Sequence, residues 1–276
     1  MKLIDMHIHS TYSDGTYSPK EIVDLSLKKG LYGISITDHD CVDGLPEAVE
    51  YCKDKNIIFI PGIEFSCFHN DEEVHILGYN IEWTYAPLLK LCQKLQDARV
   101  QRARLIIEKL RNIGFDIDYS DIEKYPANSV GRPHIGQVMV DKGYIGSVSE
   151  AFEKYIGSGM AAYVERYKLS VSDAINIIKS AKGLSVIAHP FLISNQDSID
   201  AIARMGIDGL EIYHSSHSRD ISKKYKYMAK RLGLIITGGS DFHGRNSDFD
   251  FFSNTGIKLD EMDSSLLKGV LLNGLR

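Results

Sequence analysis

A repeated alternation of short apolar segments and amphipathic segments constrains the fold of this chain more than any other feature. In the first eighty residues, strands are predicted at the apolar runs 2–9, 32–37, 57–60 and 74–79. Helices are predicted between them at 19–29 and 46–55, each with a proline near its start. Strand–helix repetition of this kind is typical of an α/β protein with a mostly parallel sheet.

The rhythm breaks near Pro87, where a long helix is predicted over 88–112. This helix carries seven basic residues against two acidic ones, and shorter helical or irregular pieces follow it. The basic run is most simply a solvated face, and the alternative is a surface that guides phosphate-rich substrates. Helix–strand pairs then resume at 171–182 with 184–188, at 198–205 with 209–213, and at 219–232 with 234–237.

These segments predict a single α/β barrel interrupted by one insertion. A length of 276 residues suits such an architecture. We expect residues 1–86 and 168–276 to form the barrel domain and 87–167 to form the helical insertion, with about seven strands in all.

Scarce polar residues cluster at the predicted strand ends. His7 and His9 lie two apart on the first strand, so both imidazoles point to the same face. In a parallel barrel the carboxyl ends of the strands meet at one mouth, where active sites are built. His75 is the exception, because it lies within its predicted strand. The candidate metal ligands are His7, His9, Asp14, His39, Glu64, His75, His189, Asp241 and His243.

Six imidazoles and three carboxylates are too many ligands for one ion, since a catalytic site takes about three. They suit two or three divalent ions, and nitrogen and oxygen ligands without thiolate favour Mn, Fe or Zn. Clustered metals polarise phosphoryl oxygens and generate hydroxide near neutral pH. Asp38 and Asp40 flank His39, and one of them is expected to orient an imidazole from behind.

Each residue also has a plainer explanation. His75 could be a core histidine, Asp14 a turn residue and Glu64 a surface acid. Such explanations would have to hold at every strand end to remove the predicted site.

The composition limits the remaining possibilities. A net charge of −5 argues against a generally basic nucleic-acid-binding surface, although it allows a local basic groove. The chain shows no apolar run of membrane-spanning length, no signal-peptide pattern and no Cys-x-x-Cys spacing. We therefore expect a cytoplasmic protein without a membrane contact, and we infer no obligate protein partner.

Several separate blocks resemble the PHP family (polymerase and histidinol phosphatase domains). They are Asp5-x-His7-x-His9-Ser10, Asp14-Gly15, Thr37-Asp38-His39-Asp40, Gly62-Ile63-Glu64, Val74-His75-Ile76-Leu77-Gly78, Ala188-His189-Pro190 and Gly239-Ser240-Asp241-Phe242-His243. The resemblance implies a distorted seven-stranded (β/α) barrel, similar to a TIM barrel, with a trinuclear metal centre. It implies one metal on His7, His9, Glu64 and Asp241, a second on Glu64, His75 and His189, and a third on Asp14, His39 and His243.

Two further blocks look like the stand-alone PHP phosphoesterases that act on nucleotides. They are Gly131-Arg132-Pro133-His134 and Glu211-Ile-Tyr-x-x-x-His217. Members of that group hydrolyse 3′,5′-nucleoside bisphosphates or trim short RNA from its 5′ end. The resemblance gives Arg132, His134 and His217 the role of holding the substrate phosphate, which suits the forked donors of arginine. His217 or a metal-bound water would protonate the leaving oxygen, whereas His214 departs from the expected pattern and receives no role.

Three alternatives remain open at this point. A histidinol-phosphate phosphatase would use the same metal ligands on another phosphate monoester. A metal-dependent amidohydrolase also carries His-x-His on its first strand, but it is expected to bind two metals. A non-enzymatic module with a degenerate site is disfavoured because all nine expected ligands are present. Arg132 could also serve in a structural salt bridge.

Overall fold

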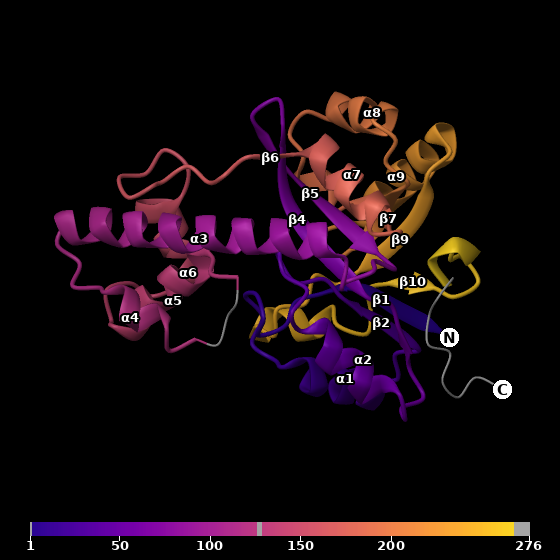
Figure 1. The fold of residues 1–276 in the computed structure, drawn as a ribbon, viewed down its shortest axis with the longest axis horizontal. Coiled ribbons are helices and arrows are strands. Elements are labelled where there is room, and N and C mark those ends of the chain that lie inside the picture. Colours follow the sequence, from indigo (N-terminus) through magenta and orange to yellow (C-terminus); the bar gives the residue numbers. More distant parts are fainter. Residues whose placement is uncertain (1, 126–128, 268–276) are drawn as a thin grey trace.

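The computed structural model describes residues 2–125 and 129–267 of the chain. Figure 1 shows a β-sheet core with helices packed around it and a helical group that extends to one side. The strands are β1 (Leu3–Ile8), β2 (Gly33–Ile36), β3 (Ile58–Phe59), β4 (Gly62–His69), β5 (Glu72–Tyr79), β6 (Leu169–Ser170), β7 (Leu184–Ile187), β8 (Gly209–His214), β9 (Ile235–Gly239) and β10 (Ile257–Lys258).

Most of the helices lie where the sequence predicts them. The α-helices are α1 (Pro19–Lys28), α2 (Leu45–Cys52), α3 (Ala86–Asn112), α4 (Tyr119–Ile122), α5 (Arg132–Asp141), α6 (Val148–Ala151), α7 (Val171–Ser180), α8 (Asp197–Arg204) and α9 (Arg219–Leu232). A π-helical turn spans Phe152–Ile156, and 3₁₀ turns span Pro190–Leu192, Asn246–Asp250 and Ser264–Leu267. The start of α1 is fixed by a capping box in which Ser18 and Glu21 satisfy each other's backbone N–H groups. No helix in the described ranges is both long and apolar enough to cross a membrane.

The strands form two sheets. One has the order β10-β1-β2-β3, and the other has the order β6-β4-β5-β7-β8-β9. Parallel pairs predominate, as the sequence predicts, but β5 is antiparallel to both β4 and β7. The sheets meet at their strand ends, where His9 N donates to Phe242 O and Asp40 N donates to Glu64 O, both at 2.9 Å. These bonds bring the ends of β1, β2 and β9 together with the start of β4.

The β4–β5 hairpin corrects the prediction that His75 is the only candidate ligand that does not lie at a strand end. Pro61 separates the two-residue β3 from β4, and Glu64 lies inside β4. Asn70 and Asp71 form the tight turn, and both have positive φ (48° and 62°), as a type I′ hairpin turn requires. Because Glu64 pairs with Leu77 and Ser66 pairs with His75, Glu64 and His75 are diagonal neighbours on one face of the sheet.

The helical group outside the sheets has a hydrophobic cluster of its own. Ile106 and Leu110 from the second half of α3 pack there with Ile135 and Met139 from α5. The first half of α3 belongs to the main core instead, through residues such as Leu88. The long helix therefore connects the two clusters, and Figure 1 shows α4, α5 and α6 grouped along its outer part.

Candidate metal centre

The structure brings all nine candidate metal ligands into one cluster. His7 lies in β1 and His9 just after it, Glu64 lies in β4 and His75 in β5. The others lie in the segments that follow strands: Asp14 after β1, His39 after β2, His189 after β7, and Asp241 and His243 after β9. Residues separated by more than two hundred positions thus meet at one edge of the fold, because the parallel strands end there.

Glu64 stands at the centre of the cluster. Its Oε1 lies 2.9 Å from His75 Nδ1 and 3.1 Å from His189 Nε2, and its Oε2 lies 2.9 Å from His39 Nδ1. Longer contacts of 3.5 and 3.3 Å reach the Nε2 atoms of His7 and His9. A fully buried carboxylate with imidazoles on both oxygens is suited to bridge two cations.

Asp241 contacts His7 and His9, and Asp14 contacts His243 and His39. Asp241 Oδ1 lies 3.3 Å from His7 Nε2 and 3.1 Å from His9 Nε2. Asp14 Oδ1 lies 3.3 Å from His243 Nε2 and 3.9 Å from His39 Nε2. Asp241 therefore faces the β1 histidines, whereas Asp14 faces His243 and His39.

The donor atoms fit metal binding better than mutual hydrogen bonding. Four overlapping groups have ligand atoms within 4.8 Å of one another: His9–Asp14–His39–His243, His7–His214–Asp241, His7–His9–Glu64 and His39–Glu64–His75. Several of these atoms are buried without a hydrogen-bond partner, including His7 Nε2, His9 Nε2, Asp14 Oδ1 and Glu64 Oε2. Buried polar atoms seldom remain unpaired in a native protein, so this cluster has the character of a site for cations.

Two opposed effects set the pKa values of the histidines in the cluster. Burial lowers these pKa values, and the neighbouring carboxylates raise them. Burial lowers the pKa of His9, but Asp241 and Glu64 outweigh it and raise that pKa to about 10. The same balance, with Glu64 and Glu73, raises the pKa of His75 to about 9. Burial prevails at His39 and lowers its pKa to about 4. Protons therefore occupy some of these imidazoles when no cation does.

Three strand ends around the site have unusual backbone conformations. Asp40, His189 and Asp241 have φ values of 52°, 26° and 58°. Such conformations cost about 1–3 kcal/mol for a residue with a side chain. They turn the chain sharply as it leaves the sheet, and at His189 and Asp241 the turn directs a candidate ligand toward the cluster.

Glu211 contacts the ring nitrogen of His7 that points away from the cluster, and sequence reasoning did not assign it this role. Its Oε1 lies 3.1 Å from His7 Nδ1, and its Oε2 accepts the backbone N–H of His189 at 2.7 Å. Because Glu211 occupies Nδ1, it leaves His7 Nε2 free to face a cation.

The expectation that Asp38 or Asp40 contacts an imidazole is not met directly. Asp38 accepts from Ser10 and from Ser13 Oγ, and Ser13 Oγ lies 3.4 Å from His9 Nδ1. Asp38 thus reaches His9 only through Ser13. Asp40 instead accepts from Arg99 Nε at 2.7 Å.

Four arginines form one wall of a cavity of about 140 Å³ beside the cluster. The charged and imidazole side chains that line this cavity are Asp14, His39, Glu73, His75, Arg99, Arg102, Arg132 and Arg166, and Glu73 is paired with Arg166. Burial and the neighbouring Arg132 and Arg166 lower the pKa of Arg102 to about 10, which reflects the crowding of positive charge. An anion would relieve that crowding, so the cavity is suited to a phosphate group.

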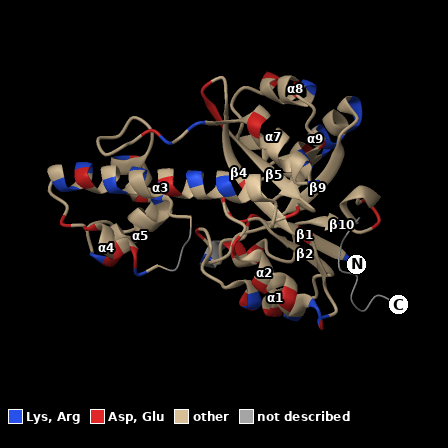
Figure 2. Cartoon of the chain, viewed as in Figure 1, with Lys and Arg blue, Asp and Glu red and all other residues tan. Residues whose placement is uncertain are grey.

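The basic run in the long helix is mostly a solvated face, as predicted, because five of its seven basic residues are exposed: Lys90, Lys94, Arg104, Lys109 and Arg111. Figure 2 shows basic residues distributed along α3. Arg99 and Arg102, however, turn inward to the cavity. The other two arginines of the wall come from α5 and from the segment before β6.

The three residues expected to hold phosphate differ in their surroundings. Arg132 lines the arginine cavity, packs on the Phe152 ring at 4.9 Å and has no ion-pair partner among the described residues. His134 is buried, and its Nδ1 accepts the Gly131 N–H at 3.0 Å. The Nδ1 of His134 therefore supports the start of α5, and the role of His134 in holding phosphate stays a prediction.

His217 lies beside His214, with ring centroids 5.3 Å apart, and lines a different cavity. Its Nδ1 donates to Ile212 O at 3.0 Å, whereas its Nε2 is buried without a hydrogen-bond partner. In the neutral ring, Nε2 consequently accepts a hydrogen bond and cannot donate one. Because burial lowers the pKa of His217, the expected phosphate-donor role requires the less favoured protonated ring.

His214 is a candidate functional residue that sequence reasoning left without a role. Its Nε2 lies 3.5 Å from Asp241 Oδ2, and its Nδ1 accepts the backbone N–H of Ser216 at 3.1 Å. Its position at the end of β8, next to the Glu211 block, was the only sequence signal for it.

Comparison with known proteins identifies the family. The PHP domain matches residues 5–174, which is more than half of the chain. The chain belongs to the PHP domain family. A 3′,5′-nucleoside bisphosphate phosphatase of Chromobacterium violaceum is 32% identical over 88% of this chain and 88% of its own length. A 5′-3′ exoribonuclease of Haemophilus influenzae is 31% identical over 88% of this chain and 90% of its own length.

Solved structures agree with this assignment. A protein of Chromobacterium violaceum, named as an amidohydrolase and holding sulfate without metal, superposes with a TM-score of 0.88. It is 29% identical, and the match covers 97% of this chain and 96% of that one. A Bifidobacterium adolescentis protein assigned to the metal-dependent phosphoesterases gives a TM-score of 0.84 at 26% identity, covering 100% and 97% of the two chains. The PHP fold of this chain is therefore shared over its whole described length.

Proposed function

We propose that this PHP chain is a metal-dependent phosphoesterase that acts on phosphorylated nucleotides, either nucleoside 3′,5′-bisphosphates or short RNA trimmed from its 5′ end. The observation that carries the proposal is the juxtaposition of nine imidazole and carboxylate side chains with the four-arginine wall. Ligands for cations beside donors for an anion are the requirements of phosphoester hydrolysis. The names of the two similar enzymes supply the substrate classes.

Two to three divalent ions, Mn, Fe or Zn, would be held by three sets of residues. The sets are His7, His9, Glu64 and Asp241; Glu64, His75 and His189; and Asp14, His39 and His243. The contacts of Glu64, Asp241 and Asp14 support this division. When bound, such ions supply a Lewis acid for the phosphoryl oxygens and a nucleophile at neutral pH.

The side chains of this protein would bind and orient the substrate. Arg132 and Arg102 have no ion-pair partner in the described part of the chain, so their guanidinium groups are available for a phosphate. Arg99 and Arg166 are already held by Asp40 and Glu73. We assign the direct phosphate contacts to the first pair and the positioning of the wall to the second pair.

We further propose that the two sheets are arcs of one distorted, seven-stranded barrel, with residues 87–167 as an insertion beside its mouth. The backbone bonds from His9 to Phe242 and from Asp40 to Glu64 support a common barrel. The separate hydrophobic cluster around Ile135 supports the insertion.

A screen of phosphate release and RNA shortening with added Mn tests the proposed function. The substrates are adenosine 3′,5′-bisphosphate, a 5′-phosphorylated short RNA and histidinol phosphate. We expect turnover of at least one of the first two and little of the third. Arg132→Gln should lower kcat/KM by about 10- to 100-fold, because it removes charged hydrogen bonds of about 1.5–3 kcal/mol.

Arg104→Gln is the matched control, since Arg104 is exposed on α3 and stacks on Tyr119 away from the cavity. Equal losses in the two variants would contradict the assigned role of Arg132. Preferred turnover of histidinol phosphate would favour a histidinol-phosphate phosphatase. Hydrolysis of amides without any phosphoester turnover would instead favour an amidohydrolase, the name given to the Chromobacterium structure.

A further inference from the structure

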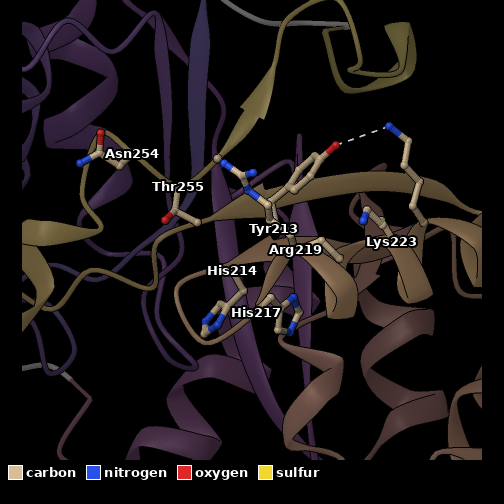
Figure 3. Close-up of a pocket in the computed structure, with 10 residues that line it drawn as sticks. Tyr213, His214, His217, Arg219, Lys223, Asn254 and Thr255 are labelled. Carbon is tan, nitrogen blue, oxygen red and sulfur yellow. Dashed lines mark hydrogen bonds between the residues drawn. The ribbon is translucent and has the colours of Figure 1, made fainter.

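A second cavity, of about 430 Å³, adjoins the metal-ligand cluster and shares no lining residue with the arginine cavity. Figure 3 shows its walls, which come from β8 and the segment after it, from α9, and from the loop before β10. The lining residues are Tyr213, His214, His217, Arg219, Ser222, Lys223, Lys226, Asn254, Thr255 and Gly256. Its volume lies in the range of small-molecule sites, about 300–1,000 Å³.

The cavity is positively charged. Arg219, Lys223 and Lys226 follow one another at helical spacing along one face of α9, and no acidic residue lines the cavity. Lys226 is paired with Glu261 at 2.7 Å. Lys223 has only the exposed Asp220 on its own helix, and Arg219 has no ion-pair partner among the described residues. At least two cations thus remain available to an anionic ligand.

The inner wall of the cavity connects it to the candidate metal centre. His214 lines the cavity, and its Nε2 lies 3.5 Å from Asp241 Oδ2. His217 lines it as well, and its Nε2 is a buried acceptor without a partner. A buried unpaired nitrogen at a cavity wall calls for a polar occupant. The half-buried ring of Tyr213 and the polar side chains of Asn254 and Thr255 complete the lining.

We propose that this cavity binds the nucleotide unit next to the reacting phosphate of a short oligonucleotide, with Arg219 and Lys223 holding the phosphodiester charge. The inference rests on the proposed phosphoesterase function and selects the oligonucleotide among its substrates. A mononucleoside bisphosphate would place one phosphate at the cluster and the other at the arginine wall. An oligonucleotide carries further phosphates, and the α9 cavity provides the second basic surface that they need.

Binding and turnover together test this proposal. The probe for binding is a 5′-phosphorylated trinucleotide with phosphorothioate linkages and a 3′ fluorophore, followed by anisotropy with the Mn-loaded protein. Arg219→Gln/Lys223→Gln should raise its Kd about 5- to 10-fold, the effect of losing two exposed charge contacts. The salt dependence of binding should weaken as well. The kcat/KM for adenosine 3′,5′-bisphosphate should change by less than about twofold.

Lys230→Gln/Arg231→Gln is the control, since it removes the same charge from the other end of α9, outside the cavity. An equal loss of affinity in the control would overturn the proposal, as would unchanged binding by the cavity variant or no trinucleotide binding by the wild-type protein. Selective loss of trinucleotide binding in a protein that hydrolyses no phosphoester would support the cavity and overturn the proposed function. Turnover of adenosine 3′,5′-bisphosphate, together with trinucleotide binding that is unaltered in the cavity variant, would support the proposed function and overturn the role of the cavity.

Discussion

At the scale of single residues, the candidate site depends on a buried carboxylate that holds the candidate ligands in position without being a candidate ligand itself. Glu211 is fully buried, contacts His7 Nδ1 and also accepts the backbone N–H of His189. It therefore fixes the ring of one candidate ligand and the backbone of another. Its negative charge also makes the His7 ring a better electron donor to a cation.

Replacing Glu211 with Gln should weaken metal binding by about 10- to 100-fold, because the amide preserves the shape of the side chain but removes the charge. Isothermal titration with Mn measures the affinity, and circular dichroism checks the fold. Glu82→Gln is a control, since Glu82 pairs with Lys182 at an exposed position. Metal affinity that is unchanged in Glu211→Gln would show that His7 needs no carboxylate behind it.

Sequence reasoning identified candidate ligands by their residue type and by their place near strand ends, and the structure brings nine of them into one cluster. Sequence reasoning could not identify hydrogen-bond partners, which depend on side-chain directions. For His134, the residue type could not reveal that its Nδ1 accepts the backbone N–H of Gly131. His214 and Glu211 reach the cluster because β8 lies next to β7 and β9, an order that no local pattern specifies.

At the scale of elements, α3 is tied to the candidate site by a buried ion pair. Arg99 donates to Asp40 and to Ser66 Oγ, and both charged side chains are nearly inaccessible to solvent. The pair holds the middle of α3 against the segment that follows β2. Breaking the pair leaves the buried Asp40 carboxylate with only a longer contact, to Arg166 at 3.8 Å.

Arg99→Leu should lower the free energy of unfolding by about 3–5 kcal/mol, measured by urea denaturation. Adding Asp40→Asn should restore part of that loss, because the stranded carboxylate is then removed. Arg111→Leu is the matched control on the same helix, since its pair with Asp118 is exposed and should contribute no more than about 1 kcal/mol. Equal effects of the two arginine substitutions would contradict the structural role of the buried pair.

Element positions were predicted well where the pattern was long and poorly where it was short. The helices at α1, α3, α7 and α9 lie close to their predicted ranges. The β4–β5 hairpin was not predicted because both faces of β4 are buried over most of its length. Such a strand lacks the alternation of exposed polar and buried apolar residues by which strands are recognised in a sequence. The signals present were Pro61, which ends β3, and the Asn70–Asp71 turn.

At the scale of the whole molecule, the candidate centre couples protons, cations and stability. The pKa values of His9 and His75 are raised to about 10 and about 9, well above the value near 6.5 in an unfolded chain. Their contribution to stability is complete below about pH 6.5 and is lost as the pH rises through 9 to 10. A cation needs the unprotonated rings, so metal affinity should rise over the same pH window.

Thermal denaturation between pH 6.5 and 9.5 should therefore give opposite trends with and without metal. In EDTA the Tm should fall as the pH rises, whereas the stabilisation produced by added Mn should grow. His9→Gln should flatten the trend in EDTA, because it removes a titrating ring. Parallel trends in the two conditions would mean that protons and cations do not compete for these side chains.

The most direct test of the central claim is the metal content of the purified protein, measured by elemental analysis after growth in Mn-supplemented medium without chelators. We expect two to three divalent ions per chain, with at least one lost in His9→Ala while circular dichroism shows the same fold. A folded wild-type protein that takes up no divalent ion, even with excess Mn, Fe or Zn, would contradict the central claim.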